Sequence, residues 1–145
     1  MTTTTSKRVA FETARLRLAR HVLADDETRY EALAQAVTIS GTALGMERTG
    51  VWFFDDAQED LQCACLYTLS SKGYESGEVL RAGTFPNYVA ALRERRAIAA
   101  SDARSHHLTR ELAGSYLIPH GIASMLDAPI IFGGRVVGVV CHEHV

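Results

Sequence analysis

Two apolar stretches near the end of the chain, residues 123–132 and 136–142, are separated by little more than the dipeptide Gly133-Gly134. This feature restricts the fold most, because a glycine pair between two apolar runs predicts a tight antiparallel hairpin. Residues 136–140 are apolar without alternation, as expected of a central strand with both faces covered. Gly138 inside this strand would let a neighbouring element approach closely. The hairpin therefore needs partner strands and a layer on each side.

A second hairpin is predicted in the middle of the chain. Residues 48–55 and 61–70 are apolar and aromatic strand candidates, and the polar residues 56–60 join them. Two such hairpins form a common sheet that helices can cover. The remaining predicted elements are short: strands at 79–81 and 97–99, helices at 85–95 and 109–119, and a loop at 70–77.

Two helices are predicted ahead of the sheet. Apolar residues recur at helical spacing over residues 9–23, and an alanine-rich second helix is predicted over 27–44. Residues 1–8 are polar and threonine-rich, so we expect a disordered start. The fold class is therefore α+β, with a central antiparallel sheet of about five to six strands flanked by helices. We expect one domain over residues 9–145, with helices at 9–44 and the sheet and pocket helices at 48–145.

Composition excludes several classes of protein. A chain of 145 residues is the size of one domain, and 47% hydrophobic with 22% charged residues is the balance of a folded globular protein. The formal net charge of −2 argues against a strongly basic nucleic-acid binder. No apolar run approaches the roughly 20 residues of a membrane span, and the polar start lacks the apolar core of a signal peptide. We therefore expect a cytoplasmic domain.

The three cysteines, Cys63, Cys65 and Cys141, are an odd number without a secretion signal, so a disulfide framework is not expected. If residues 61–70 form a strand, the Cys63-x-Cys65 spacing places both side chains on one face. We interpret all three as small buried hydrophobic residues. The spacing of His106, His107 and His120 fits no zinc pattern, so no metal site is predicted.

Four segments of the sequence resemble a GAF domain, the small-molecule-sensing module of bacterial signalling proteins. They are GVWFFD at 50–55, ASDAR at 100–104, HGIASMLDAPI at 120–130 and GGRVVGVVCHE at 133–143. The resemblance extends from about Glu27 onward and implies a GAF/PAS-like fold. It also implies a helix after the last strand, which is missing here because the chain stops at Val145. We therefore expect the chain to be a piece of a longer protein.

The resemblance further implies a non-catalytic sensory or regulatory domain of a bacterial signal-transduction protein, of the sensor histidine kinase or diguanylate cyclase type found in two-component systems. Such a domain binds a small molecule, mediates dimerisation, or does both, and so controls an attached output domain. Because helices with excess apolar surface pair, we expect a homodimer through the N-terminal helices. The candidate dimer residues are Phe11, Leu18, Val22, Leu33 and Val37.

GAF domains bind ligands between the sheet and the short helices of the second half. By this resemblance the pocket candidates are Trp52, Phe54, Cys65, Tyr67, Phe85, Tyr88, Asp102, Tyr116 and Met125. Aromatic walls with a few polar tips suit a small-molecule pocket; the alternative is that these side chains fill a closed core. The ligand is unknown. Cyclic nucleotides are disfavoured because the Asn-Lys…Phe…Asp-Glu set is missing, and bilins because Cys141-His142 lies in a predicted strand.

One enzymatic alternative stays open, since some GAF-fold proteins resemble free methionine sulfoxide reductases. Such chemistry needs a reactive thiolate beside a resolving cysteine, and Cys65 with Cys141 would form that pair if their strands lie close together. The sequence contains no nucleophile elbow, phosphate-binding loop, HExxH or paired-carboxylate motif. We therefore predict that the domain alone is not an enzyme.

Overall fold

The computed structural model describes residues 2–20 and 29–145, and the side chains of residues 4–17 and 29–145. Its helices are α1 (Thr2–Arg20), α2 (Arg29–Leu44) and α3 (Pro86–Arg93), with short turns η1 (Ala82–Thr84), η2 (Arg110–Leu112) and the π-helical η3 (Ala113–Leu117). Its strands are β1 (Arg48–Phe54), β2 (Asp60–Thr68), β3 (Gly73–Glu75), β4 (Val79–Arg81), β5 (Ile98–Ala100), β6 (Ser124–Phe132) and β7 (Arg135–His144). No helix in the described part of the chain is long and apolar enough to cross a membrane.

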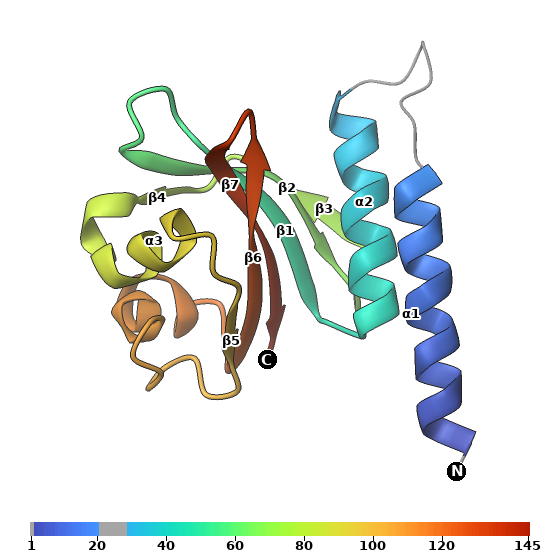
Figure 1. Cartoon of the computed structure of the whole chain (residues 1–145). Helices are drawn as coiled ribbons and strands as arrows, with labels where there is room; N and C mark the ends of the chain where they lie inside the picture. Colours follow the sequence, from blue (N-terminus) through green and yellow to red (C-terminus); the bar gives the residue numbers. More distant parts are fainter. Residues whose placement is uncertain (1, 21–28) are drawn as a thin grey trace.

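All strands belong to one antiparallel sheet with the order β3-β2-β1-β7-β6-β5, and β4 also pairs with β2 (Figure 1). This confirms the predicted α+β class and both predicted hairpins, β1–β2 and β6–β7. The sheet has seven strands where about five to six were expected. The extra strand is β3, which lies in the predicted loop and pairs with the end of β2.

The sheet separates two apolar cores. On one face, α2 covers β1 and β2, and α1 lies outside α2 (Figure 1). On the other face, α3 and the short turns η1 to η3 form a second layer over the sheet. The larger core lies on this second face and the smaller one lies under α2. The strand β7 lies between β1 and β6. Its side chains therefore point alternately into the two cores, as its unbroken apolar run predicts.

A β-bulge in β2 corrects the prediction for the cysteines. Val51 of β1 faces Cys65 and Trp52 faces Cys63, so Ala64 is an extra residue in β2. A bulge of this kind interrupts the alternation of side chains along the strand. As a result Cys63 belongs to the larger core and Cys65 to the core under α2. The expectation that both side chains share one face is wrong.

Close approach of the backbone requires glycine at position 138. A Cβ atom there would lie 2.1 Å from the backbone oxygen of Trp52 in the neighbouring strand β1. This confirms the predicted role of Gly138. At Gly41 in α2, a Cβ atom would lie 2.6 Å from Oγ1 of Thr49, so the alanine- and glycine-rich α2 packs closely on the sheet.

The N-terminal region differs from the sequence prediction. The helix α1 begins at Thr2, so residues 2–8 are helical where a disordered start was expected. Extending an existing helix adds one hydrogen bond for each residue ordered, which makes such an extension inexpensive. In the described part of α1, the side chains of residues 4–17 are exposed except for Ala14, which is half-buried.

Only part of the predicted dimer set is available to a partner. Val37 is 1% exposed under the sheet-facing side of α2, and Leu33 packs against the same core, so assigning these two residues to a dimer surface is wrong. The α-helical period places them toward the sheet of their own chain. Phe11 on α1 is 44% exposed. The side chain of Leu18, and Val22 altogether, lie outside the described residues.

Replacing Gly138 by alanine tests the close packing of β7 on β1. We expect Gly138→Ala to destabilise the fold by about 2–3 kcal/mol, because the backbone of β1 must move to accept the methyl group. The melting temperature should fall by roughly 8–12 °C. The control is Gly83→Ala, where an added Cβ meets nothing within 4 Å. Equal melting temperatures for the two variants would contradict the interpretation.

Candidate functional site

A small closed cavity lies between the sheet and the layer of short helices. Its volume is about 10 Å³, the lower limit for holding a single water molecule. The walls are mainly aromatic, aliphatic and sulfur-containing, and they come from β1, β2, β4, β6, β7, α3, η2 and η3. The lining residues are Trp52, Leu61, Leu80, Tyr88, Leu112, Tyr116, Met125, Val139, Cys141 and Glu143.

One polar contact at this site joins α3 to the sheet. The hydroxyl of Tyr88 donates to Oδ2 of Asp127 at 2.5 Å and lies 3.8 Å from Sγ of Cys141. Asp127 and Cys141 are cross-strand neighbours on β6 and β7. Burial and the nearby charge of Glu143 raise the pKa of Asp127 to about 8, so this carboxyl is mainly protonated at pH 7. A neutral carboxyl is the form that a buried site without a cation favours.

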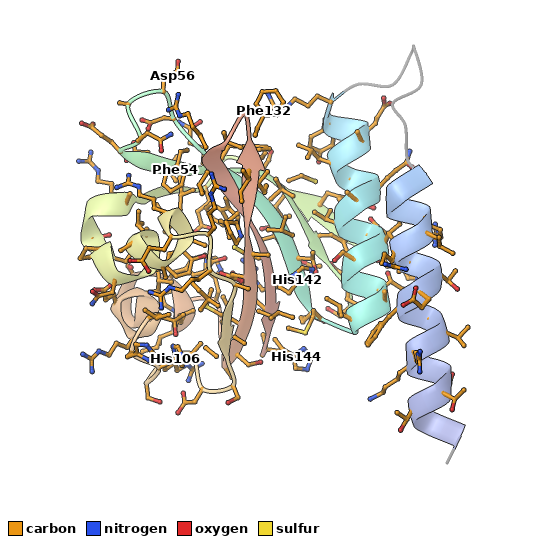
Figure 2. All side chains as sticks on the ribbon, in the orientation of Figure 1. Phe54, Asp56, His106, Phe132, His142 and His144 are labelled. Atoms are coloured by element: carbon orange, nitrogen blue, oxygen red, sulfur yellow. The ribbon has the colours of Figure 1, made fainter. Side chains whose placement is uncertain are left out.

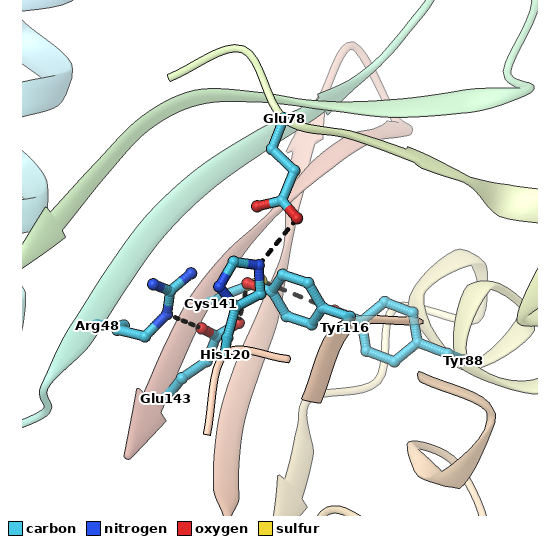
Figure 3. Close-up of polar contacts among 7 residues, drawn as sticks. All are labelled: Arg48, Glu78, Tyr88, Tyr116, His120, Cys141 and Glu143. Atoms are coloured by element: carbon cyan, nitrogen blue, oxygen red, sulfur yellow. Dashed lines mark hydrogen bonds and ion pairs between the residues drawn. The ribbon is translucent and has the colours of Figure 1, made fainter. Parts of the chain in front are cut away.

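A second polar contact joins η3 to the sheet. The hydroxyl of Tyr116 donates to Oε1 of Glu143 at 2.7 Å, and Nε of Arg48 donates to Oε2 of the same carboxylate at 3.0 Å (Figure 3). Arg48 and Glu143 are cross-strand neighbours on β1 and β7, and the Glu143 side chain is 1% exposed. The arginine therefore compensates a buried carboxylate, which would otherwise be costly.

At the outer side of η3, His120 bridges to the segment before β4. Its Nε2 lies 3.0 Å from Oε1 of Glu78, and its ring packs edge-on against Tyr116 with centroids 4.9 Å apart (Figure 3). The side chains of His120 and Glu78 are both partly exposed. The tyrosine thus contacts the buried carboxylate inside and the histidine outside.

Two buried polar atoms near the cavity have no hydrogen-bond partner among the described residues. They are Nε1 of Trp52, whose ring lines the cavity, and Oδ1 of Asp127. An unsatisfied buried polar group costs about 1–3 kcal/mol. Asp127 does not line the cavity itself, but its Oδ2 is bonded to Tyr88, which does.

The cavity unites part of the predicted pocket set. Trp52, Tyr88, Tyr116 and Met125 line it. Phe85 lies in the same core, with its ring 5.9 Å from that of Tyr88, and Phe54 packs at the edge of this core.

The other predicted pocket residues lie elsewhere. Cys65 and Tyr67 are buried on the opposite face under α2, and Asp102 is exposed in the loop after β5. The expectation that these three share the pocket is therefore wrong. The bulge in β2 accounts for the two core residues, since it moves the side chains beyond Ala64 to the other face.

Sequence reasoning missed the buried charges of the site, namely Arg48, Asp127 and Glu143. Each lies in or at the end of an otherwise apolar strand, and a charged residue inside such a run was the available signal. Asp127, Cys141 and Glu143 all appear within the two segments that form the final hairpin. Their convergence depends on the register of β6 with β7, which the sequence does not state.

The arrangement does not favour thiol chemistry. Burial raises the pKa of Cys141 well above its ordinary value and raises that of Cys63 to about 12. Thiols, rather than reactive thiolates, therefore prevail. Cys65 lies on the opposite face of the sheet from Cys141, and Cys63 lies two strands away, at about 10 Å. The expectation that Cys65 and Cys141 could form a close pair is wrong.

The histidines at positions 106–144 do not converge on a metal site. Within residues 2–20 and 29–145, no group of three or more His, Cys, Asp or Glu side chains has metal-binding geometry. His106 lies in the loop before η2. Phe132 lies in the β6–β7 turn, at the opposite end of the molecule (Figure 2). His142 points toward α2, where its Nε2 lies 2.5 Å from Oγ of Ser40 (Figure 2). This contact links β7 to α2.

The protonated state of Asp127 predicts a pH dependence of stability. Because its pKa is raised to about 8, the folded protein keeps a proton that the unfolded chain releases near pH 4. The free energy of unfolding therefore falls as pH rises from about 4 to about 8. The side chain of Asn does not titrate, so Asp127→Asn should abolish this pH-dependent loss of stability. The melting temperature of the variant relative to wild type should rise by roughly 10–15 °C between about pH 5 and about pH 8.

The control for this measurement is Asp102→Asn. The hydrogen bond from Ser105 lowers the pKa of the exposed Asp102, so any effect of its titration lies below the measured range. Other buried groups, such as Glu143 and His142, titrate in both proteins, and the difference between the two curves removes their contribution. Parallel curves for wild type and Asp127→Asn would show that the carboxyl is not protonated.

Several solved structures share this fold at low sequence identity. The GAF domain of a phosphoenolpyruvate-protein phosphotransferase from Coxiella burnetii has a TM-score of 0.67 and 14% identity, with 99% of this chain and 80% of that chain covered. The phycocyanobilin-bound GAF domain of a cyanobacterial phytochrome has a TM-score of 0.69 and 13% identity, covering 95% and 79%. Free methionine-R-sulfoxide reductase from Neisseria meningitidis has a TM-score of 0.65 and 19% identity, covering 95% and 72%.

No curated protein matches the chain. The profile of the GAF domain, in contrast, matches residues 28–145, which include α2, the whole sheet and the layer of short helices. The matched part contains every residue that lines the cavity. The chain belongs to the GAF domain family.

Proposed function

We propose that this GAF domain is a non-catalytic receiver of a small-molecule signal and that it controls an output domain attached to it in a cytoplasmic bacterial signalling protein. The observation that carries the proposal is the cavity between the sheet and the short helices, with aromatic walls and unpartnered buried polar atoms. Small-molecule sites combine apolar walls with a few placed polar groups in this way. The phytochrome GAF domain, a structural relative, is one that binds a chromophore.

A ligand larger than water requires the layer of short helices to move. The free cavity holds about one water, whereas Trp52, Tyr88 and Tyr116 could stack on a planar molecule if the layer opened. A ligand that binds the open form better than the closed form shifts the balance between them. Such a shift would be the signal. The hydroxyls of Tyr88 and Tyr116 and Nε1 of Trp52 would form hydrogen bonds with polar groups of the ligand.

Dimerisation would carry this signal to an output domain. Val9 and Leu16 are 60% and 49% exposed and lie seven residues apart on one face of α1, whereas Phe11, 44% exposed, lies on another face. The helix α1 packs on α2 rather than on the sheet. An exposed helix of this kind gains stability when a second copy covers its apolar side chains. We therefore propose a homodimer in which α1 of each copy contacts its partner. The histidine kinase or diguanylate cyclase class of the output domain remains part of this proposal.

The second candidate is a redox enzyme of the methionine sulfoxide reductase type, one of which is a structural relative. Cys141 in the cavity wall favours it. The raised pKa of this thiol and the distance to the other cysteines oppose it, because reductase chemistry through one cysteine needs a resolving partner. We therefore rank it below the regulatory function.

Native mass spectrometry of the purified protein tests ligand binding. We expect a bound small molecule in wild-type protein and in Cys65→Ala, and loss of most of it in Cys141→Ala. The two variants are matched, because both remove a buried thiol, one in the cavity wall and one on the other face. Protein free of any added mass in every preparation, together with no thermal shift in a metabolite screen, would contradict the proposal.

The same pair of variants separates regulation from redox catalysis. Reduction of free methionine sulfoxide is expected from none of the three proteins. Activity in wild type that disappears in Cys141→Ala or in Cys65→Ala would make the domain an enzyme and overturn the ranking.

Light scattering tests the dimer. One chain has a mass of 15.9 kDa, and we expect wild type at twice this mass. The double variant Val9→Ser/Leu16→Ser should raise the dissociation constant by at least about tenfold, because two exposed apolar side chains on one face of α1 leave the interface. Phe132→Ser is the control, since it removes a side chain that is 79% exposed at the β6–β7 turn. Wild type that stays monomeric at high concentration would sink this part of the proposal.

A further inference from the structure

Residues 113–121 form a short roof over one side of the cavity. Tyr116 in η3 reaches the cavity, while Ile118 on the outer side is 58% exposed. The segment has π-helical hydrogen bonds, from the amide of Ile118 to the oxygen of Ala113 at 2.9 Å and from the amide of Ile122 to the oxygen of Leu117 at 2.8 Å. Such turns are rare and occur frequently at functional sites.

Both ends of this segment are anchored by hydrogen bonds, whereas its centre is held by two polar side-chain contacts and by the packing of Tyr116 and Leu117 in the larger core. Before the segment, Oγ1 of Thr109 donates to the oxygen of Ala103 at 2.6 Å; after it, Nε of Arg104 donates to the oxygen of Ile122 at 2.9 Å. Gly121, with φ of +68°, lies next to the second anchor. The centre is held by Tyr116 on Glu143 and by His120 on Glu78.

The cost of breaking polar contacts with the sheet differs between residues 113–121 and α3. If Tyr116 leaves Glu143, the carboxylate keeps its ion pair with Arg48, so no buried charge is left alone. If Tyr88 on α3 leaves Asp127, the carboxyl loses its hydroxyl partner while its other oxygen is already unpartnered. The polar contact of residues 113–121 with the sheet is therefore cheaper to break than that of α3.

We propose that residues 113–121 are the lid of the ligand cavity and that the His120–Glu78 contact is its latch. Backbone hydrogen bonds attach the segment around Glu78 to β2. The carbonyl oxygen of Glu78 accepts from the amide of Cys63 at 2.8 Å, and the amide of Gly77 donates to the carbonyl oxygen of Cys63 at 2.9 Å. The latch thus ties the lid to the segment that leads into β4 (Figure 3). Leu80 of β4 is part of the cavity wall. This inference rests on the proposed function, because it gives the cavity an entrance.

The chain contains built-in probes for opening. Trp52 is the only tryptophan, and its ring lines the cavity. Cys141 lines the cavity as well, whereas Cys65 lies beneath α2 on the other face. Opening of the lid exposes the first two side chains to solvent and leaves Cys65 covered. General loosening of the fold exposes all three.

The experiment compares wild type with Glu78→Gln, which weakens the latch, and with Tyr116→Phe, which removes the inner contact. We measure acrylamide quenching of Trp52 fluorescence and the rates at which a thiol reagent labels Cys141 and Cys65, located by mass spectrometry. We expect quenching and Cys141 labelling to rise by about two- to fivefold in Glu78→Gln, the range that loss of a partly exposed contact gives. Tyr116→Phe removes a hydrogen bond to a buried carboxylate, so there the rise should be about tenfold or more. Cys65 labelling should not change.

The matched control is Glu94→Gln, which breaks an exposed ion pair of similar length, 2.9 Å to Arg96, away from the lid. It should behave as wild type. Unchanged Cys141 labelling and quenching in both lid variants would overturn the proposal, and so would Cys65 labelling that rises in parallel. No ligand is used, so failure of the lid leaves the mass-spectrometric test of ligand binding unaffected.

Discussion

The arrangement of this domain depends on β7, a strand with a packed layer on each of its faces. Gly138 lets β7 approach β1 so closely that a methyl group would collide with the backbone of Trp52. Alternation along the strand then sends Val139, Cys141 and Glu143 toward the short helices, and Val140 and His142 toward α2. Any displacement of β7 is therefore felt in both layers.

Two sets of buried polar groups link this sheet to the layer of short helices. Arg48 and Glu143 pair across β1 and β7 and receive the hydroxyl of Tyr116 from η3. Asp127 on β6 receives the hydroxyl of Tyr88 from α3. The segments η3 and α3 are thus each attached to the sheet by a tyrosine hydroxyl that bonds a buried carboxyl group. They differ because Glu143 has a second, charged partner, while Asp127 stays neutral through its raised pKa.

The same strand connects the cavity with the helices that would transmit a signal. His142 follows Cys141 directly, and its Nδ1 donates to the oxygen of Leu126 while its Nε2 accepts from Ser40 on α2. Burial lowers the pKa of His142, which keeps the ring neutral and suited to accept this bond. Contacts of β7 with α2 thus connect the cavity side of the sheet physically to the helical side.

The sequence by itself determined the class of fold and most element positions. Glycine pairs, apolar periods and polar breaks act over a few residues, so both hairpins, the α2 helix and the short helices followed from local rules. The aromatic residues Trp52, Tyr88 and Tyr116 were also within reach, since bulky aromatic side chains in such elements are buried. Only the tertiary structure decided which residues meet. One extra residue in β2, Ala64, moved Cys65 and Tyr67 to the far face, and strand register brought Arg48 to Glu143 and Asp127 to Cys141. Register depends on contacts between residues distant in the chain, and a slip of one position exchanges the two faces of a strand.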